Sequence, residues 1–110
     1  MCDGGDSITR LYRAALACRH DDPSTSPTAR LLRSGRGKVA KKFGDEATSV
    51  VIDAIDGDRD AMIVECADLI YHLVVLWISV GVRPEAIWKT VDRRERLVAS
   101  PRVTDRRQRK

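Results

Sequence analysis

The sequence predicts an all-α protein, a helical bundle that a second copy of the chain completes. Apolar residues recur every three or four positions along most of the 110 residues, which is the spacing of one helix face. The sequence contains no alternating strand pattern and no internal repeat. Domains typically hold about 100 to 150 residues, so we expect one helical domain over residues 1–100 and a basic, flexible tail over residues 101–110.

Two helices are expected in the first third of the chain. Residues 8–16 carry isoleucine, leucine and alanine at helical spacing. The segment HDDPSTSP at residues 20–27 is a turn, and its last serine and proline are typical of a helix start because proline fits the first helical turn. A short helix therefore follows over residues 27–32, and the two glycines of residues 34–37 end it.

Two long helices and a last amphipathic one follow. Residues 38–56 have one predicted apolar stripe, formed by Val39, Ala40, Phe43, Ala47, Val50, Val51, Ala54 and Ile55. Gly57 ends this helix and Asp58 caps the next, over residues 59–80, so this short connection makes the two helices antiparallel neighbours. Proline suits the start of the final helix, over residues 84–97.

The helix over residues 59–80 is apolar on nearly every side, which is typical of a helix surrounded by others. The remaining helices of so short a chain can hardly surround it. We therefore expect a homodimer in which this helix packs against its copy.

The net charge of +4 belongs to the end of the chain. The first hundred residues are neutral, and the tail carries Arg102, Arg106, Arg107, Arg109 and Lys110 against Asp105. We interpret this segment as a solvated terminus. The alternative, a nucleic-acid-binding module, predicts salt-sensitive binding that is lost on truncation after Ser100.

Composition indicates a soluble cytoplasmic chain. The three cysteines form neither an even set nor a C-x-x-C pair, which fits a reducing compartment. The first ten residues have acids where a signal peptide has a basic start. The longest apolar run covers the 12 positions from 69 to 80, whereas a membrane span needs about 20.

Polar residues form two lines on the long helices. Glu65, Asp68 and His72 follow one another at three and four positions inside the apolar helix. The preceding helix has a second line, expected on the side away from Phe43, which is formed by Lys38, Lys42, Asp45, Glu46, Ser49 and Asp53. This second line suits a solvated face with local ion pairs, or a surface that faces the first line.

Carboxylates from the two lines can converge because the helices are neighbours. Burying them unpaired costs several kcal/mol, so a cation must stand opposite, either a basic side chain or a metal. Mg²⁺ suits such a site because it prefers oxygen ligands and keeps positions for water or phosphate oxygens. With lysines nearby, the arrangement favours a polyphosphate substrate.

Two motifs carry a family resemblance. The segments GDEATS at residues 44–49 and ECADLIYH at residues 65–72 resemble the phosphoribosyl-ATP pyrophosphohydrolases of histidine biosynthesis, in the all-α group that includes MazG and the all-helical dUTPases. The group signature is E-E-x-x-E followed by E-x-x-D. Glu46, Glu65 and Asp68 match it, whereas Asp45 is one methylene shorter and Ser49 has no charge.

The resemblance implies Mg²⁺-dependent hydrolysis of phosphoribosyl-ATP to phosphoribosyl-AMP and pyrophosphate. The implied metal and catalytic residues are Glu46, Glu65, Asp68 and, in second rank, Asp45. The implied substrate contacts are Lys42, Lys38 and Lys41, with Arg30, Arg33 and Arg36 from the short helix and the loop. His72 is interpreted as a satisfied core histidine or as a partner of a ligand carboxylate, and Asp53 as a candidate to compensate for Ser49.

Other functions remain open at this point. A housekeeping nucleoside triphosphate pyrophosphohydrolase has the same fold and differs in its substrate. A helical dimer that binds partners and has lost catalysis is the alternative from another class, and Ser49 supports it because metal affinity falls when a ligand charge is missing.

Overall fold

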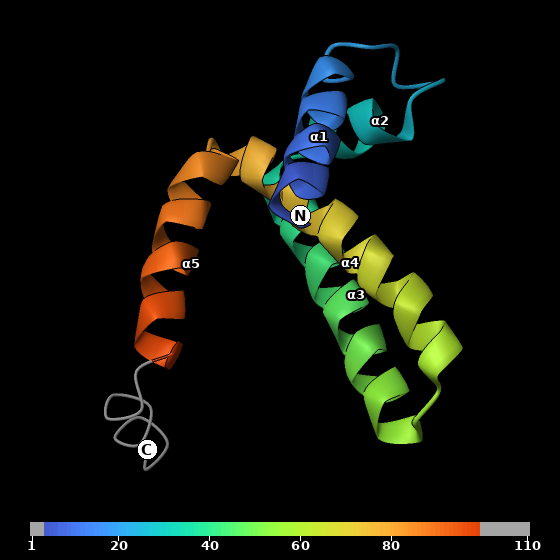
Figure 1. The fold of residues 1–110 in the computed structure, drawn as a ribbon. Coiled ribbons are helices and arrows are strands. Elements are labelled where there is room, and N and C mark those ends of the chain that lie inside the picture. The colour runs from blue at the N-terminus through green and yellow to red at the C-terminus, as the bar shows by residue number, and fades with distance from the viewer. Residues whose placement is uncertain (1–3, 100–110) are drawn as a thin grey trace.

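A computed structural model describes residues 4–99, with the backbone alone for residues 4–6. Within that range it has five helices and no strand, so the all-α prediction is confirmed (Figure 1). The helices are α1 (Gly4–Ala17), α2 (Pro27–Arg33), α3 (Arg36–Asp56), α4 (Arg59–Val80) and α5 (Pro84–Ala99). Cys2 and the predicted basic tail lie outside the described residues.

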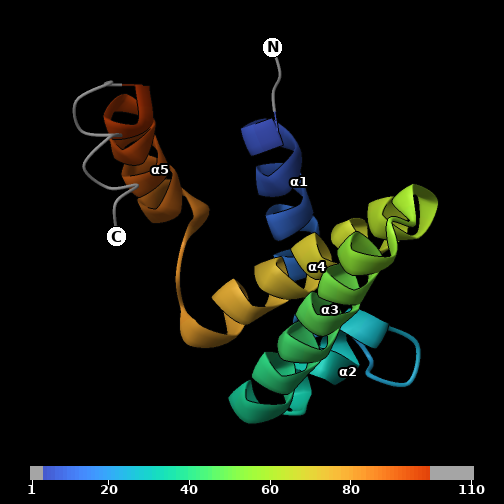
Figure 2. The same cartoon turned by 90° about the horizontal axis from the view of Figure 1, so that it is seen from below.

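The dominant feature is an antiparallel hairpin of α3 and α4 (Figures 1 and 2). Gly57 ends α3 in the left-handed conformation, with φ 72°, which glycine adopts without the steric cost of a side chain. The Asp58 side chain then accepts a hydrogen bond from the backbone N–H of Ala61 at 3.1 Å and caps α4. This turn fixes which residues of the two helices face each other.

The connection between α2 and α3 is shorter than the sequence predicts. Ser26 caps α2 by accepting a hydrogen bond from the Ala29 N–H at 3.1 Å, as expected. Gly35 has φ 98° and directly precedes α3, which begins at Arg36. One glycine with positive φ is enough for this bend, so the helix extends through Gly37.

The core lies where α1 crosses the C-terminal half of α4. Ala15 of α1 packs with Val74, Trp77 and Ile78 of α4. Trp88 of α5 meets Trp77 edge-on, with ring centroids 6.2 Å apart. In both views α5 stands apart from α3, so only this half of α4 is enclosed (Figures 1 and 2).

The far half of the hairpin extends beyond α1 and α2 (Figure 1). Its exposed apolar residues are Val51, Ile52, Ile55, Ile63 and Val64, and Ile55 is 79% exposed. We call these five residues the apolar face.

The predicted apolar stripe of α3 is therefore correct only in part, because Ala47 and Val50 are half-buried as expected whereas its last residues are exposed. The side of α3 that is buried or half-buried carries Val39, Phe43, Glu46, Val50 and Asp53, whereas Ala40, Val51, Ala54 and Ile55 are exposed. The expectation that Glu46 and Asp53 lie away from Phe43 is also wrong. Helical spacing fits two adjacent stripes of α3, and the stripe that packs in this chain is the one that carries the carboxylates.

By length and composition alone, the 22-residue helix α4 is apolar enough to cross a membrane. The same composition is found in helices that pack inside a protein. Glu65 and Asp68 lie within α4 and approach Glu46 of α3, which gives this helix a polar side as well.

The Asp58 cap generates a stability prediction. Asp58→Ala removes the acceptor for the Ala61 N–H and should lower the free energy of unfolding by about 1 kcal/mol. Asp58→Asn keeps an acceptor oxygen and should cost much less. Urea denaturation followed by circular dichroism measures both, and equal losses in the two variants would contradict the capping role.

Candidate metal centre and adjoining pocket

Three carboxylates converge across the hairpin. Glu46 comes from α3, and Glu65 and Asp68 come from α4. One oxygen of each lies within 4.8 Å of the others. Glu65 and Asp68 are three positions apart and therefore lie on one side of α4. The antiparallel turn places this side next to Glu46 of α3.

Two carboxylate oxygens at this interface have no partner. Within residues 7–99, Glu46 Oε1 and Asp53 Oδ2 are buried and form no hydrogen bond. An unpaired buried charge is costly, whereas a cation would satisfy these oxygens. Hard divalent cations take oxygen ligands of this kind, so the residues present fit such an ion.

The surroundings of Glu65 raise the pKa of its carboxyl group. Partial burial is the largest cause that raises its pKa above the ordinary range, followed by a contact with the Glu46 carboxyl that favours the protonated form. The charges of Glu46, Asp53 and Asp68 raise it further. The carboxylates of the cluster therefore repel one another when ionised, which favours a cation at this position.

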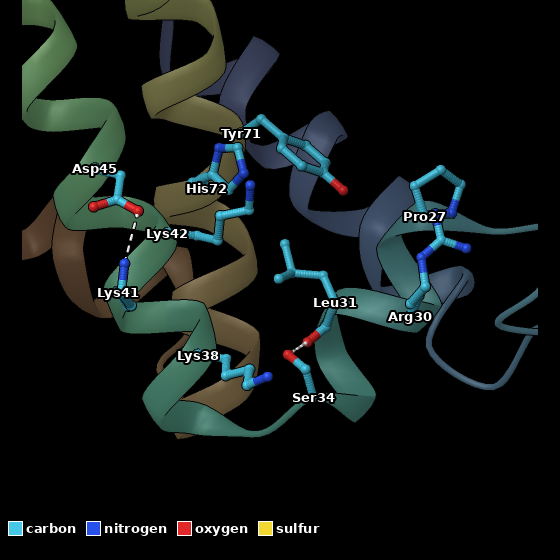
Figure 3. Close-up of a pocket in the computed structure, with 10 residues that line it drawn as sticks. All are labelled: Pro27, Arg30, Leu31, Ser34, Lys38, Lys41, Lys42, Asp45, Tyr71 and His72. Atoms are coloured by element: carbon cyan, nitrogen blue, oxygen red, sulfur yellow. Dashed lines mark hydrogen bonds and ion pairs between the residues drawn. The ribbon is translucent and has the colours of Figure 1, made fainter.

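A pocket of about 760 Å³ lies between α2, α3 and α4 (Figure 3). Its lining residues are Pro27, Arg30, Leu31, Ser34, Lys38, Lys41, Lys42, Asp45, Tyr71 and His72. Lys38 and Lys42 extend from α3 toward α2 (Figure 3). Four cationic side chains and one acid make the pocket strongly positive, which suits an anionic ligand.

The structure places most predicted substrate contacts on this pocket. Arg30, Lys38, Lys41 and Lys42 line it, whereas Arg36 is not among the lining residues. Arg30 also donates a hydrogen bond to the Pro23 carbonyl at 2.6 Å, which anchors its guanidinium to the preceding loop.

His72 is half-buried and forms part of the pocket wall. Its Nδ1 lies 2.8 Å from the backbone carbonyl of Asp68, and since a carbonyl accepts, this nitrogen donates. The hydrogen bond supports the satisfied-histidine interpretation. Because it orients the ring, Nε2 is the nitrogen left for another partner.

Sequence reasoning did not single out Tyr71 as a site residue. Its hydroxyl lies 2.6 Å from Thr28 Oγ1, which links α4 to α2, and its ring meets His72 edge-on at 5.1 Å. The residue is half-buried and lines the pocket. Its position beside His72 on the apolar helix was the signal available in the sequence.

Comparison with known proteins identifies the family. The family model described as phosphoribosyl-ATP pyrophosphohydrolase matches residues 9–95. The chain belongs to this family. A relative named phosphoribosyl-ATP pyrophosphatase 2 from Rhodopseudomonas palustris is 58% identical over 93 residues, which cover 84% of this chain and 71% of the relative.

Two further relatives of this pyrophosphohydrolase agree. A phosphoribosyl-ATP pyrophosphatase 2 from Bradyrhizobium diazoefficiens is 51% identical, with 93% of this chain and 88% of the relative covered. A histidine biosynthesis bifunctional protein from Thermotoga maritima is 36% identical, with 78% of this chain and 44% of the relative covered. The resemblance inferred from the two sequence motifs is thus confirmed.

Two positions of this pyrophosphohydrolase depart from the E-E-x-x-E signature. Asp45 is exposed, lies outside the three-carboxylate cluster and pairs with Lys41 Nζ at 3.3 Å. Ser49 turns its hydroxyl back onto its own helix and donates to the Asp45 carbonyl at 3.3 Å. Neither side chain adds a charge to the cluster in this structure.

The raised pKa of Glu65 generates a prediction for the metal-free protein. Below the ordinary glutamate pKa of about 4.3, Glu65 is neutral and does not destabilise the folded state. As pH rises through the raised pKa that Glu65 has in the folded state, its carboxylate ionises beside the other acids and this stability is lost. Glu65→Gln should therefore raise the thermal midpoint in EDTA at pH 7.5 and change it little at pH 4.

The charge-matched control for this measurement is Asp60→Asn, at an exposed position on the same helix. This change should not produce the same pH-dependent gain. A Glu65→Gln midpoint at or below that of the wild type at pH 7.5 would show that the carboxylates do not repel one another as described.

Proposed function

We propose that this chain hydrolyses phosphoribosyl-ATP to phosphoribosyl-AMP and pyrophosphate, the second step of histidine biosynthesis, in the cytoplasm. Family membership and the names of the relatives support the substrate and the reaction. The observation that carries the mechanism is the convergence of Glu46, Glu65 and Asp68 beside a cationic pocket.

Glu46, Glu65 and Asp68 would hold Mg²⁺. When bound, the ion neutralises phosphate charge, polarises the phosphorus under attack and lowers the pKa of a bound water. Oxygen ligands from two packed helices suit this ion, because it requires a defined arrangement of hard donors. Because Glu46 and Glu65 are half-buried, bulk water would compete less with the ion for their carboxylate oxygens.

The cationic pocket would bind the phosphates. Lys42 and Lys38 extend into the space next to α2 (Figure 3). They are the leading contacts, since neither side chain takes part in the ion pairs found within residues 7–99. Lys41 is paired with Asp45 and contributes less net charge. Leu31 and the Tyr71 ring give the pocket an apolar wall for an adenine base.

Asp45 would orient the attacking water. Its carboxylate lies on the pocket wall and outside the three-carboxylate cluster, and the next residue along the chain is Glu46. A carboxylate at the edge of a metal centre is suited to accept the proton of an activated water.

The chain would work as a homodimer. The apolar face on the far half of the hairpin is uncovered in the single chain, and Ile63 and Val64 there are 67% and 60% exposed. Exposed apolar clusters of this kind mark interaction sites. A second hairpin packed on this face would turn two helices into a four-helix bundle and would cover these apolar side chains.

The activity prediction uses Mg²⁺ and phosphoribosyl-ATP, with pyrophosphate release as the readout. Wild type should release pyrophosphate, and Glu65→Gln should reduce the rate by at least about a hundredfold, because it removes a charge that holds the ion (about 2.7 kcal/mol of transition-state stabilisation). Asp60→Asn should keep wild-type activity.

A panel of nucleoside triphosphates tests the substrate in the same assay. Faster pyrophosphate release from ordinary nucleoside triphosphates than from phosphoribosyl-ATP would favour a housekeeping hydrolase. Absence of release from every nucleotide, with an intact circular dichroism spectrum, would favour a binding protein without catalysis.

The dimer prediction concerns the mass in solution. Light scattering coupled to size exclusion, without detergent, should give twice the 12.3 kDa mass of one chain. Ile63→Glu places a charge on the apolar face and should shift the protein to the monomer, whereas Ile63→Leu should remain dimeric. A wild-type monomer, or a protein that requires detergent to stay in solution, would contradict the proposed assembly.

A further inference from the structure

One hydrogen bond joins two walls of the cationic pocket. The Tyr71 hydroxyl of α4 lies 2.6 Å from Thr28 Oγ1 of α2, and both residues are half-buried. This separation is at the short end of the usual range for hydrogen bonds between hydroxyl groups. The other side-chain hydrogen bonds of the pocket wall described within residues 7–99 stay within one helix or reach the loop before α2. The Thr28–Tyr71 hydrogen bond is therefore the one in this range that ties two of the pocket's helices together.

The helix α2 supplies a wall that neither α3 nor α4 provides. It contributes Pro27, Arg30 and Leu31 to the pocket, whereas the lysines come from α3 (Figure 3). The helix has seven residues, and a helix this short is not stable without tertiary contacts. The distance between the two walls therefore depends on the contacts that hold α2 in place.

Apolar packing attaches α2 to the rest of the chain, and the hydrogen bond orients it. Ala29 is fully buried, and Leu32 packs against the core of α1 and α4. Burial of apolar surface has no preferred direction, whereas a hydrogen bond requires its donor and acceptor to be aligned. Thr28 and Leu31 are three positions apart and so lie on one side of α2. The hydrogen bond therefore sets how this side of α2 faces the pocket.

The two walls suit different parts of a nucleotide. Lys38 and Lys42 of α3 attract phosphate groups through their charge, which acts over a distance and needs little alignment. Leu31 of α2 and the Tyr71 ring offer an apolar surface to a base. Such a contact needs a close fit, because dispersion attraction falls steeply when a gap opens. A shift of α2 would thus weaken the contact with the nucleoside more than the contact with the phosphates.

We propose that Thr28 and Tyr71 are positioning residues that hold α2 as the nucleoside wall of the pocket. They make the site select nucleotides over bare polyphosphates. The proposal rests on the nucleotide-hydrolysing function given above and adds how its substrate is recognised. A wall that is held in place loses less conformational freedom when a ligand binds, which strengthens binding.

The test compares the binding of ATP and of inorganic tripolyphosphate to the full chain by calorimetry. EDTA is present, so that neither metal binding nor hydrolysis contributes. Tyr71→Phe removes the hydroxyl and keeps the ring. It should weaken ATP binding by about fivefold or more, as expected for one lost hydrogen bond, and should change tripolyphosphate binding by less than about twofold.

Three further variants separate positioning from a general loss of structure. Thr28→Val should weaken ATP binding as Tyr71→Phe does, whereas Thr28→Ser restores the hydroxyl and should recover most of the affinity. The double variant Tyr71→Phe/Thr28→Val should bind ATP no more weakly than the weaker single variant, because both changes remove the same contact.

The matched control is Thr9→Val. Thr9 Oγ1 accepts the part-buried hydrogen bond that Trp88 Nε1 donates from α5 to α1 at 3.4 Å, and neither residue lines the pocket. This variant also loses a hydrogen bond between two helices. It should keep both affinities even where its thermal midpoint falls.

The remaining outcomes distinguish this inference from the proposed function. An unchanged ATP affinity in Tyr71→Phe, or equal weakening for both ligands, overturns the positioning role. A wild type that binds tripolyphosphate as tightly as ATP, or binds neither, overturns the nucleoside wall. If ATP binding depends on the Thr28–Tyr71 pair but no nucleotide releases pyrophosphate with Mg²⁺, the inference holds and the hydrolase function fails.

Discussion

Repulsion between carboxylates on the facing sides of α3 and α4 is the constraint on which this structure depends. Glu46, Glu65 and Asp68 have oxygens within 4.8 Å of one another, and two oxygens at the interface are buried without partners. Holding such charges together is unfavourable unless a cation neutralises them. Packing elsewhere must therefore keep the hairpin closed against this repulsion.

The rest of the chain supplies this packing. The left-handed Gly57 and the Asp58 cap set the register of the hairpin. At the other end, α1 and Trp88 of α5 enclose the C-terminal half of α4, and the Tyr71–Thr28 hydrogen bond attaches α2. The cationic pocket is close to the acids, because Asp45 and His72 line it, Asp45 precedes Glu46 and His72 is hydrogen-bonded to the Asp68 carbonyl. Positive and negative side chains are thus separated along one hairpin, which suits a metal–polyphosphate ligand.

Features determined by local sequence were predictable, whereas those determined by long-range packing were not. The five helices, the antiparallel turn and the convergence of Glu46 with Glu65 follow from spacing and from a short connection. The buried stripe of α3 did not, because its apolar residues fit two neighbouring stripes and Ile55 faces outward. The contact of Tyr71 with Thr28 joins positions 43 residues apart, and no local pattern encodes it.

The central claim is tested most directly by locating a bound ion. Crystals grown with Mn²⁺, with anomalous scattering measured at the manganese absorption edge, would show where the ion lies. The account predicts a peak between α3 and α4 within coordination distance, about 2.0 to 2.3 Å, of carboxylate oxygens of Glu46, Glu65 and Asp68. A peak elsewhere, or a Glu46 side chain turned away from Glu65 in the metal-loaded crystal, would contradict it.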